Sequence, residues 1–255
     1  MASPSIAPLR FARLLGLLSV VTYNWWVGAA LAGLVTSPDG MFSDLEATGV
    51  RHAHIFERLD IASGILVCVG LLILRAPADH DRRREWWLLI AFGLSGIIGG
   101  LFPYACPEGK NDLCRDAEWH FELPLHHYIH MVSGIFEFAF ATIAIICMWR
   151  RLRAAAESAW RRTGELLALG LVVGYPALAL SYLTDRWDAP VEAFFFVLFA
   201  VLVGAAFLEP REQDQPRTER ARSTSSPIAA SSSSTESNRS MPRKRSTKAT
   251  STSRS

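Results

Sequence analysis

Residues 120–137 combine histidines and carboxylates at the point where a polar stretch becomes a long apolar run. The segment reads HFELPLHHYIHMVSGIFE. If a helix starts near Pro124, polar side chains recur at i, i+4, i+7 and i+11 and share one helical face. These side chains are His126, His130, Ser133 and Glu137. The spacing predicts a polar stripe that enters an apolar helix.

Two histidines at i, i+4 can bind the same metal ion, as the paired histidines of zinc enzymes do. His126 and His130 have this spacing, and the cofactor they would hold is zinc or another divalent metal. The HExxH signature of metalloproteases is absent, because His127 stands where its glutamate would be. The alternative is that the histidines are hydrogen-bonded residues at a membrane surface. Further candidate ligands are His120, His127, His52, His54 and Asp60.

Glu137 lies two turns inside the apolar run, where a charged side chain costs at least ~2.5 kcal/mol. Such a residue is a candidate for function, and Ser133 and Asp60 are the other catalytic candidates. Asp60 and Ser63 are spaced i, i+3, so the two would complete an outward-opening polar pocket if they faced the stripe. The alternative is a protonated or Asn24-bonded Glu137 that only joins helices.

Long apolar runs surround the stripe and indicate helices that cross a membrane. Half of the 255 residues are hydrophobic, and they are clustered in runs close to the length that a bilayer core requires. We predict an all-α fold, a polytopic membrane protein with a bundle of six transmembrane helices in residues 1–210. A signal peptide cleaved at Ala30-Leu31-Ala32 is the alternative for the first run. The predicted spans are about 12–35, 60–75, 86–103, 127–149, 165–183 and 190–208.

The distribution of arginine predicts how the bundle is oriented. Segments 75–85 and 150–164 are rich in arginine, which indicates cytoplasmic loops. We therefore predict a plasma-membrane protein with both termini in the cytoplasm and every histidine except His80 outside. Only five of the 26 lysines and arginines then lie outside: Arg51, Arg58, Lys110, Arg115 and Arg186. The acidic residues outside are Asp39, Asp44, Glu46, Glu57, Asp60, Glu108, Asp112, Asp116, Glu118, Glu122, Asp185, Asp188 and Glu192.

Cys106 and Cys114 lie eight residues apart in the predicted outer loop. We expect a disulfide, because disulfides persist outside the cytoplasm. A metal site built on these thiolates is disfavoured, because the spacing is not CxxC. The bond would fix the loop that presents His120 and Glu122 to the mouth of the helix.

From residue 211 the composition changes to serine, threonine, arginine and proline, with almost no large apolar side chain. Such a segment cannot offset its conformational entropy by burial, so residues 211–255 are predicted to be a disordered cytoplasmic tail. The basic cluster at residues 243–245 is a candidate for contact with anionic lipid, and a tail without a specific partner is the alternative. The predicted partner of the chain is the lipid bilayer. Nucleic acid is not an expected partner, and the sequence does not indicate the oligomeric state.

The chain from about Phe11 to Leu208 resembles bacterial, in particular actinobacterial, integral membrane proteins grouped as domain of unknown function 998. Similar proteins have six spans, an FP-type helix end, a loop with two cysteines and an H-x-x-H helix start. The chain departs from them in its doubled histidine and its serine-rich tail. The matching residues are Phe102-Pro103, Cys106, Cys114, His127 and His130. The resemblance implies the six-helix architecture and brings no established activity.

We expect a multi-pass membrane protein of undefined biochemical role. Its extracytoplasmic pocket, rich in His, Asp and Glu, would bind a metal, protons, or a small or lipid ligand. One alternative is a metal-dependent hydrolase of a lipid or envelope substrate, in which the metal activates water and Glu137 moves protons. Another is a transporter with a path along Glu137. No complete catalytic constellation can be read, so the sequence leaves open whether the protein is an enzyme.

Overall fold

The computed structural model describes residues 6–35, 37–107, 111–155 and 159–210, and the predicted disordered tail lies outside them. The described residues contain helices and no β-strand, which confirms the all-α prediction. The helices are α1 (Ile6–Tyr23), α2 (Trp25–Leu31), the 3-10 helix η1 (Ser43–Glu46), α3 (Ala53–Leu74), α4 (His80–Leu101), α5 (Asp112–Trp119), α6 (Leu125–Ala154), α7 (Arg161–Thr184) and α8 (Asp188–Leu208).

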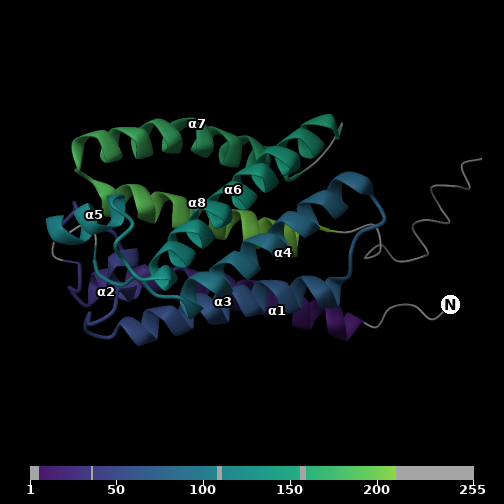
Figure 1. The fold of residues 1–255 in the computed structure, drawn as a ribbon. Helices are drawn as coiled ribbons and strands as arrows, with labels where there is room; N and C mark the ends of the chain where they lie inside the picture. Colours follow the sequence, from purple (N-terminus) through teal and green to yellow (C-terminus); the bar gives the residue numbers. More distant parts are fainter. Residues whose placement is uncertain (1–5, 36, 108–110, 156–158, 211–255) are drawn as a thin grey trace, which may run out of the picture. The chain divides into compact units, whose positions relative to one another are not determined.

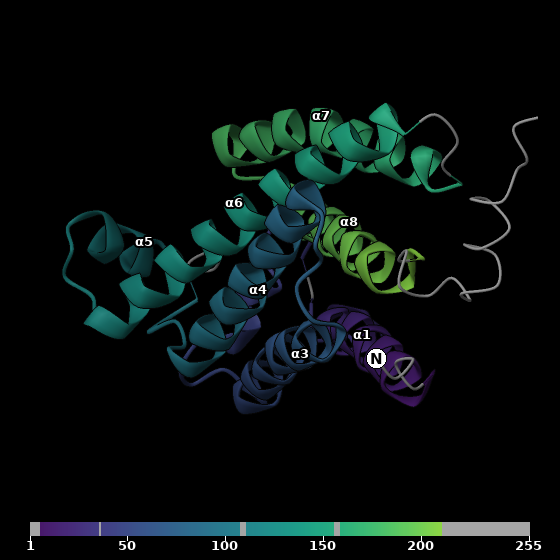
Figure 2. The same ribbon diagram turned by 90° about the vertical axis from the view of Figure 1, so that its right-hand side faces the viewer.

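The long helices run alternately in opposite directions and pack in a ring (Figures 1 and 2). In the ring, α3 lies between α1 and α4, α6 between α4 and α7, and α8 between α7 and α1. Phe195 and Phe199 of α8 are fully buried. They pack against Phe138 of α6, and Phe199 also packs against Phe92 of α4. The apolar core therefore joins helices that are distant in the sequence.

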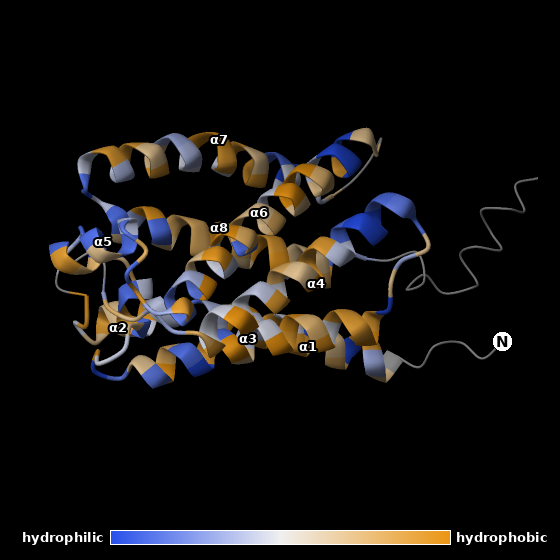
Figure 3. Ribbon diagram, in the orientation of Figure 1, coloured by the Kyte–Doolittle hydropathy of each residue, from blue (hydrophilic) through white to orange (hydrophobic). Residues whose placement is uncertain are grey.

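Two ends of the bundle differ in charge, and polar segments at both ends flank the apolar middle (Figure 3). We call the end where α3, α6 and α8 begin the acidic end; it also carries α2, η1 and α5 (Figure 1). We call the opposite end, where α4 and α7 begin, the basic end. His80 lies at the basic end, and the other six histidines lie at the acidic end.

Four segments among the described residues are long and apolar enough to cross a membrane. They are Ala7–Leu31 (which covers α1 and α2), α6, α7 and α8. The length and apolar composition of these segments are compatible with a membrane protein. Helices α3 and α4 are not among the four. Their first turns carry charges, such as Glu57 and Asp60 in α3 and Arg84 in α4, so the apolar part of each helix is short.

The first predicted span differs from the observed helices. Helix α1 begins at Ile6, whereas the predicted span begins near residue 12. Helix α2 ends at Leu31, whereas the predicted span continues to residue 35. A break at Asn24 separates α1 from α2. The Asn24 amide donates to the Val20 carbonyl (2.8 Å) and accepts from the Trp26 indole (3.0 Å). Asn24 is thus satisfied locally, and the interpretation in which it bonds Glu137 is wrong.

Helix α5 was not predicted. Asn111 precedes it, and the Asn111 side chain accepts hydrogen bonds from the backbone N–H groups of Leu113 (3.1 Å) and Cys114 (3.4 Å). This is the usual way in which asparagine caps the start of a helix. In contrast, the predicted helix start near Pro124 is confirmed, because α6 begins at Leu125.

Helices α3 and α4 cross at Gly64 and Gly93. A Cβ atom added to Gly64 would lie 2.3 Å from the Gly93 carbonyl oxygen, so neither backbone has room for a side chain there. Small residues allow this close approach in membrane helices. One turn toward the acidic end, the crossing brings Asp60 of α3 beside Gly96 of α4.

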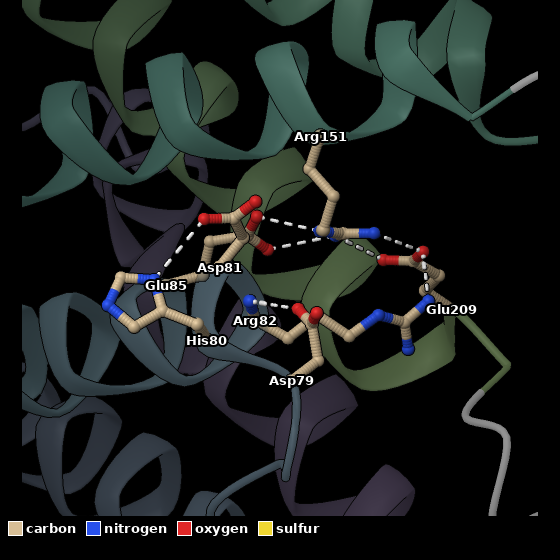
Figure 4. A network of polar contacts seen from close by, with 7 residues as sticks. All are labelled: Asp79, His80, Asp81, Arg82, Glu85, Arg151 and Glu209. Carbon is tan, nitrogen blue, oxygen red and sulfur yellow. Dashed lines mark hydrogen bonds and ion pairs between the residues drawn. The ribbon is translucent and has the colours of Figure 1, made fainter.

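A buried ion network joins three helices at the basic end (Figure 4). The Arg151 guanidinium of α6 binds Glu85 of α4 at 2.7 and 2.8 Å and Glu209, directly after α8, at 2.8 and 2.7 Å. Arg82 of α4 also donates to Glu209 (2.8 Å). The network has two positive and two negative charges, so the charges balance inside a poorly solvated site.

Candidate functional site: a carboxylate cluster

Four carboxylates from four separate elements lie within electrostatic reach of one another at the acidic end. Glu46 lies in η1, Asp60 in α3, Glu137 in α6 and Glu192 in α8. Glu46 interacts electrostatically with each of the other three. We call these four residues the carboxylate cluster.

Asp60 accepts a hydrogen bond from a neutral donor. The Trp25 indole N–H donates to Asp60 Oδ1 at 2.7 Å, and the Trp25 ring stacks on Phe56 with the ring centres 4.5 Å apart. The carboxyl groups of Asp60 and Glu46 also interact electrostatically at short range. Two like charges this close in a poorly solvated site repel each other, so the arrangement favours a proton on one of the two groups.

Glu46 is only 2% exposed. Its Oε2 atom is buried and has no hydrogen-bond partner among the described residues. Burial raises the pKa of Glu46 well above its ordinary value, and the nearby Asp60 raises that pKa further. Both effects favour the neutral acid, because desolvation and a like charge each disfavour the ionised form.

Glu137 lies between α6 and α4. The Tyr23 side chain interacts electrostatically with the Glu137 carboxylate. A Cβ atom added to Gly96 would lie 3.8 Å from Glu137 Oε1, so the Glu137 carboxylate packs against α4 at a position that has no side chain. Glu137 and Asp60 also interact electrostatically, and the two predicted catalytic candidates therefore do lie near each other.

Glu192 connects α8 to the segment before η1. Its carboxylate accepts from the backbone N–H of Phe42 and from that of Ser43 at 3.2 Å. No ion pair between described residues joins an arginine or lysine to any member of the carboxylate cluster. Its partners are instead backbone amides, an indole and a phenol, all of which are neutral.

The other stripe residues bond to the end of α4. His130 is buried, and its Nδ1 lies 3.0 Å from the carbonyl oxygens of both Gly99 and Phe102. Helix ends leave carbonyls without a regular intrahelical partner; the Gly99 carbonyl accepts from the Phe102 N–H (3.2 Å), and the imidazole N–H supplies a further donor. Ser133 donates to the His130 carbonyl at 2.6 Å. His130, Ser133 and Glu137 thus face α4, as one stripe would.

His127 is fully buried and holds α6 against the loop before it. Its Nδ1 accepts from the Ala105 N–H (3.3 Å), so Nε2 carries the proton and donates to Glu118 Oε2 (2.8 Å). Cys106, next to Ala105, is bonded to Cys114 of α5, with Cα atoms 6.1 Å apart. The predicted disulfide is confirmed, and it lies directly beside this histidine.

Comparison with known proteins gives one match. A family model described as "Protein of unknown function (DUF998)" matches residues 11–209. The chain belongs to the DUF998 family. No curated protein and no solved structure matches the chain. The matched residues include α1 from residue 11 onward, all later helices to α8 and the whole carboxylate cluster. The DUF998 family has no assigned activity.

The remaining predicted ligands do not join the cluster in this DUF998 chain. His126 is half-buried, and His52 and His54 are exposed. His120 is exposed too; its bond to the Asp116 carbonyl (2.8 Å) and the Asp116 charge raise the pKa of His120. In the described part of the chain, no three His, Cys, Asp or Glu side chains are arranged to hold a metal. Ser63 donates to the Ser19 carbonyl (3.2 Å) and thus faces α1.

Sequence reasoning did not single out Glu46 or Glu192 among the acidic residues of this end. Glu192 carried a weaker form of the signal of Glu137, because it lies near the start of an apolar helix rather than two turns inside it. Glu46 carried none. Its burial depends on η1, where Leu45 is buried beside it and Phe42 packs against Trp26.

Proposed function

We propose that this DUF998 protein is a six-span plasma-membrane protein whose carboxylate cluster binds and releases protons on the extracytoplasmic side. One observation carries the proposal: the cluster gathers four carboxyl groups and no cationic partner from the described residues. Like charges in one poorly solvated site cannot all be ionised without a counter-charge. Protons are the simplest counter-charge.

Contacts within the cluster support protons as its ligand. The interacting and buried Glu46 and Asp60 carboxyl groups favour a proton on one of the two, because both cannot be ionised without a counter-charge. The Trp25 and Tyr23 side chains stabilise the cluster as neutral partners and leave its charge unchanged. Groups that interact this closely titrate as a unit, so the protons belong to the cluster rather than to one residue.

The six spans of the proposal include α3 and α4. Each has 22 residues, which corresponds to about 33 Å at about 1.5 Å per residue and matches a hydrocarbon core of roughly 30 Å. Both helices complete the ring between α1 and α6, and their charged turns lie at the two ends. With these spans, residues 1–210 form the membrane domain and residues 211–255 a cytoplasmic tail.

The basic end would face the cytoplasm, because arginines gather there around the ends of α4, α6 and α7. Reporter fusions after Arg83 and after Asp112 test this orientation. We expect a cytoplasmic signal from the first and an extracytoplasmic signal from the second. The reverse pattern would overturn the orientation.

Proton uptake by the purified protein tests the proposed function. Infrared difference spectra between acidic and neutral samples report the carbonyl stretch of protonated carboxyl groups. We expect Glu46→Gln and Glu137→Gln each to remove part of this signal. Glu122→Gln is the matched control, because Glu122 is an exposed glutamate of the same end. Spectra of the cluster variants that coincide with those of the control would disprove proton binding by the cluster.

Transport is a second candidate function, favoured by the position of Glu137 well inside the span formed by α6. Proton flux into liposomes separates transport from binding alone. A transporter would lose its flux in the Glu137→Gln variant, whereas a protein that only binds protons would show no flux in either form. A metal-dependent hydrolase is not proposed, because the described residues offer no group of three ligands.

A further inference from the structure

A cavity of about 450 Å³ lies between α4 and α6 at the basic end, away from the carboxylate cluster. Its lining has two chemically different parts. The first turns of α4 contribute cationic groups, and the following turns together with α6 contribute apolar ones. The lining includes His80, Arg83, Arg84, Trp87, Ala91 and Phe140.

Arg84 provides the charge of the cavity mouth. It is exposed and makes no ion pair with a described residue. Arg83 is held at the mouth, since its Nε donates to the Pro77 carbonyl (3.0 Å) and its Nη2 to the Ala78 carbonyl (2.9 Å). These neutral partners leave the Arg83 charge uncompensated. Arg82 differs, because it is paired with Glu209.

No acidic side chain among the described residues forms an ion pair with Arg83 or Arg84. The Asp79 carboxylate accepts from the backbone N–H of Arg82 (2.8 Å) and so caps α4. Asp81 lies 3.5 Å from the His80 ring, and Glu85 is bound to Arg151 (Figure 4). The two arginines of the mouth therefore remain available to an anion from outside the chain.

The wall of the cavity is apolar. Trp87 is 59% exposed although its ring is large, and Phe140 stacks on Phe136 with ring centres 5.8 Å apart. Tryptophan at this position is typical of the boundary between a bilayer core and its headgroups. A cationic mouth above an apolar wall matches a molecule with an anionic head and a hydrocarbon chain.

We propose that this cavity binds a phospholipid with an anionic headgroup. Its phosphate would lie against Arg83 and Arg84, and one acyl chain would lie along Trp87 and Phe140. Basic pockets between membrane helices are known to recognise anionic headgroups. The site lies at the opposite end of the bundle from the carboxylate cluster, and it stands whether or not the cluster binds protons.

Native mass spectrometry of the full chain in detergent tests the site with three probes. These are phosphatidylglycerol, phosphatidylcholine with the same acyl chains, and inorganic phosphate. We expect phosphatidylglycerol to be retained at least about fivefold more than phosphatidylcholine, and phosphate at equal concentration not to displace it. Equal retention of the two lipids would overturn the proposal, as would displacement by phosphate alone.

Two variants test the two parts of the cavity independently. Arg84→Gln should weaken phosphatidylglycerol binding about fivefold, the equivalent of ~1 kcal/mol for one basic residue. Ala91→Trp should weaken it by filling the apolar wall. Arg162→Gln, an exposed arginine of α7 outside the cavity, should leave binding unchanged. A loss as large in the Arg162 control would reject the site, and the lipid comparison in the parent chain decides even if a variant fails to fold.

Discussion

The Trp25 indole donates a 2.7 Å hydrogen bond to the Asp60 carboxylate and thereby joins α2 to α3 at the mouth of the carboxylate cluster. A neutral donor stands where a buried carboxylate would usually meet a lysine or arginine. The donor satisfies one oxygen of Asp60 and adds no positive charge. Among the described residues the cluster has no cationic partner, which is why we propose protons as its counter-charge.

Trp25→Phe should destabilise the protein by about 1 kcal/mol, a typical value for one hydrogen bond. Phenylalanine retains an aromatic ring for stacking on Phe56 and loses only the N–H donor. Unfolding in mixed micelles measures the change. Trp187→Phe is the control, because the Trp187 ring is exposed. A loss no larger than that of the control would show that the Asp60 bond contributes nothing.

Glu46→Gln should make stability less dependent on pH. An unfolded glutamate has a pKa of about 4.3, and burial raises the pKa of Glu46 in the folded chain. Above that unfolded value, the unfolded chain releases a proton that the folded chain keeps. The free energy of unfolding therefore falls as the pH rises, until the pH passes the raised pKa. Glutamine is neutral in both states, so the Glu46→Gln variant does not show this pH-dependent fall in the free energy of unfolding.

Thermal unfolding from about pH 4 to pH 8 measures the effect. Parent and variant should differ least at the acidic limit, and the parent should lose more stability toward neutral pH. The groups facing Glu46, namely Asp60, Glu137 and Glu192, titrate in both proteins. Parallel curves for the parent and Glu46→Gln would contradict the prediction.

His127→Ala should destabilise the protein by about 2–4 kcal/mol, because it leaves the buried Glu118 carboxylate without its partner. His126→Ala should change stability by less than about 0.5 kcal/mol, because His126 is only half-buried. Chemical unfolding of the two variants under non-reducing conditions compares neighbouring histidines directly. If His126 proved the costlier loss, the assignment of His127 as the structural residue would fail.

Arg151→Met should cost about 3–5 kcal/mol, since it leaves Glu85 and Glu209 as buried charges without their main partner. Adding Glu85→Gln and Glu209→Gln removes those charges and should restore much of the stability. Unfolding of the single and triple variants measures both effects. A triple variant as unstable as the single one would mean that lost packing, rather than unpaired charge, explains the cost.

Several features of this fold could be predicted from short stretches of sequence. Apolar runs predicted the long helices, because a helix that must satisfy its own backbone in lipid needs such a run. The predicted extracytoplasmic position of Cys106 and Cys114 led us to expect their bond, and the structure contains it. Helical periodicity placed His130, Ser133 and Glu137 on one face, and the structure agrees.

Which residues meet across that face was decided by the tertiary structure. Periodicity determines the face of its own helix on which a side chain lies. It does not determine which helix packs against that face, or at which level along their axes the two helices meet. The crossing at Gly64 and Gly93 brings Asp60 to the level of Glu137. His130 bonds to the end of α4, and the folded segment around η1 buries Glu46 against Asp60. The sequence by itself therefore determined the helices and the faces of their polar residues, whereas helix packing decided that carboxylates rather than histidines form the cluster.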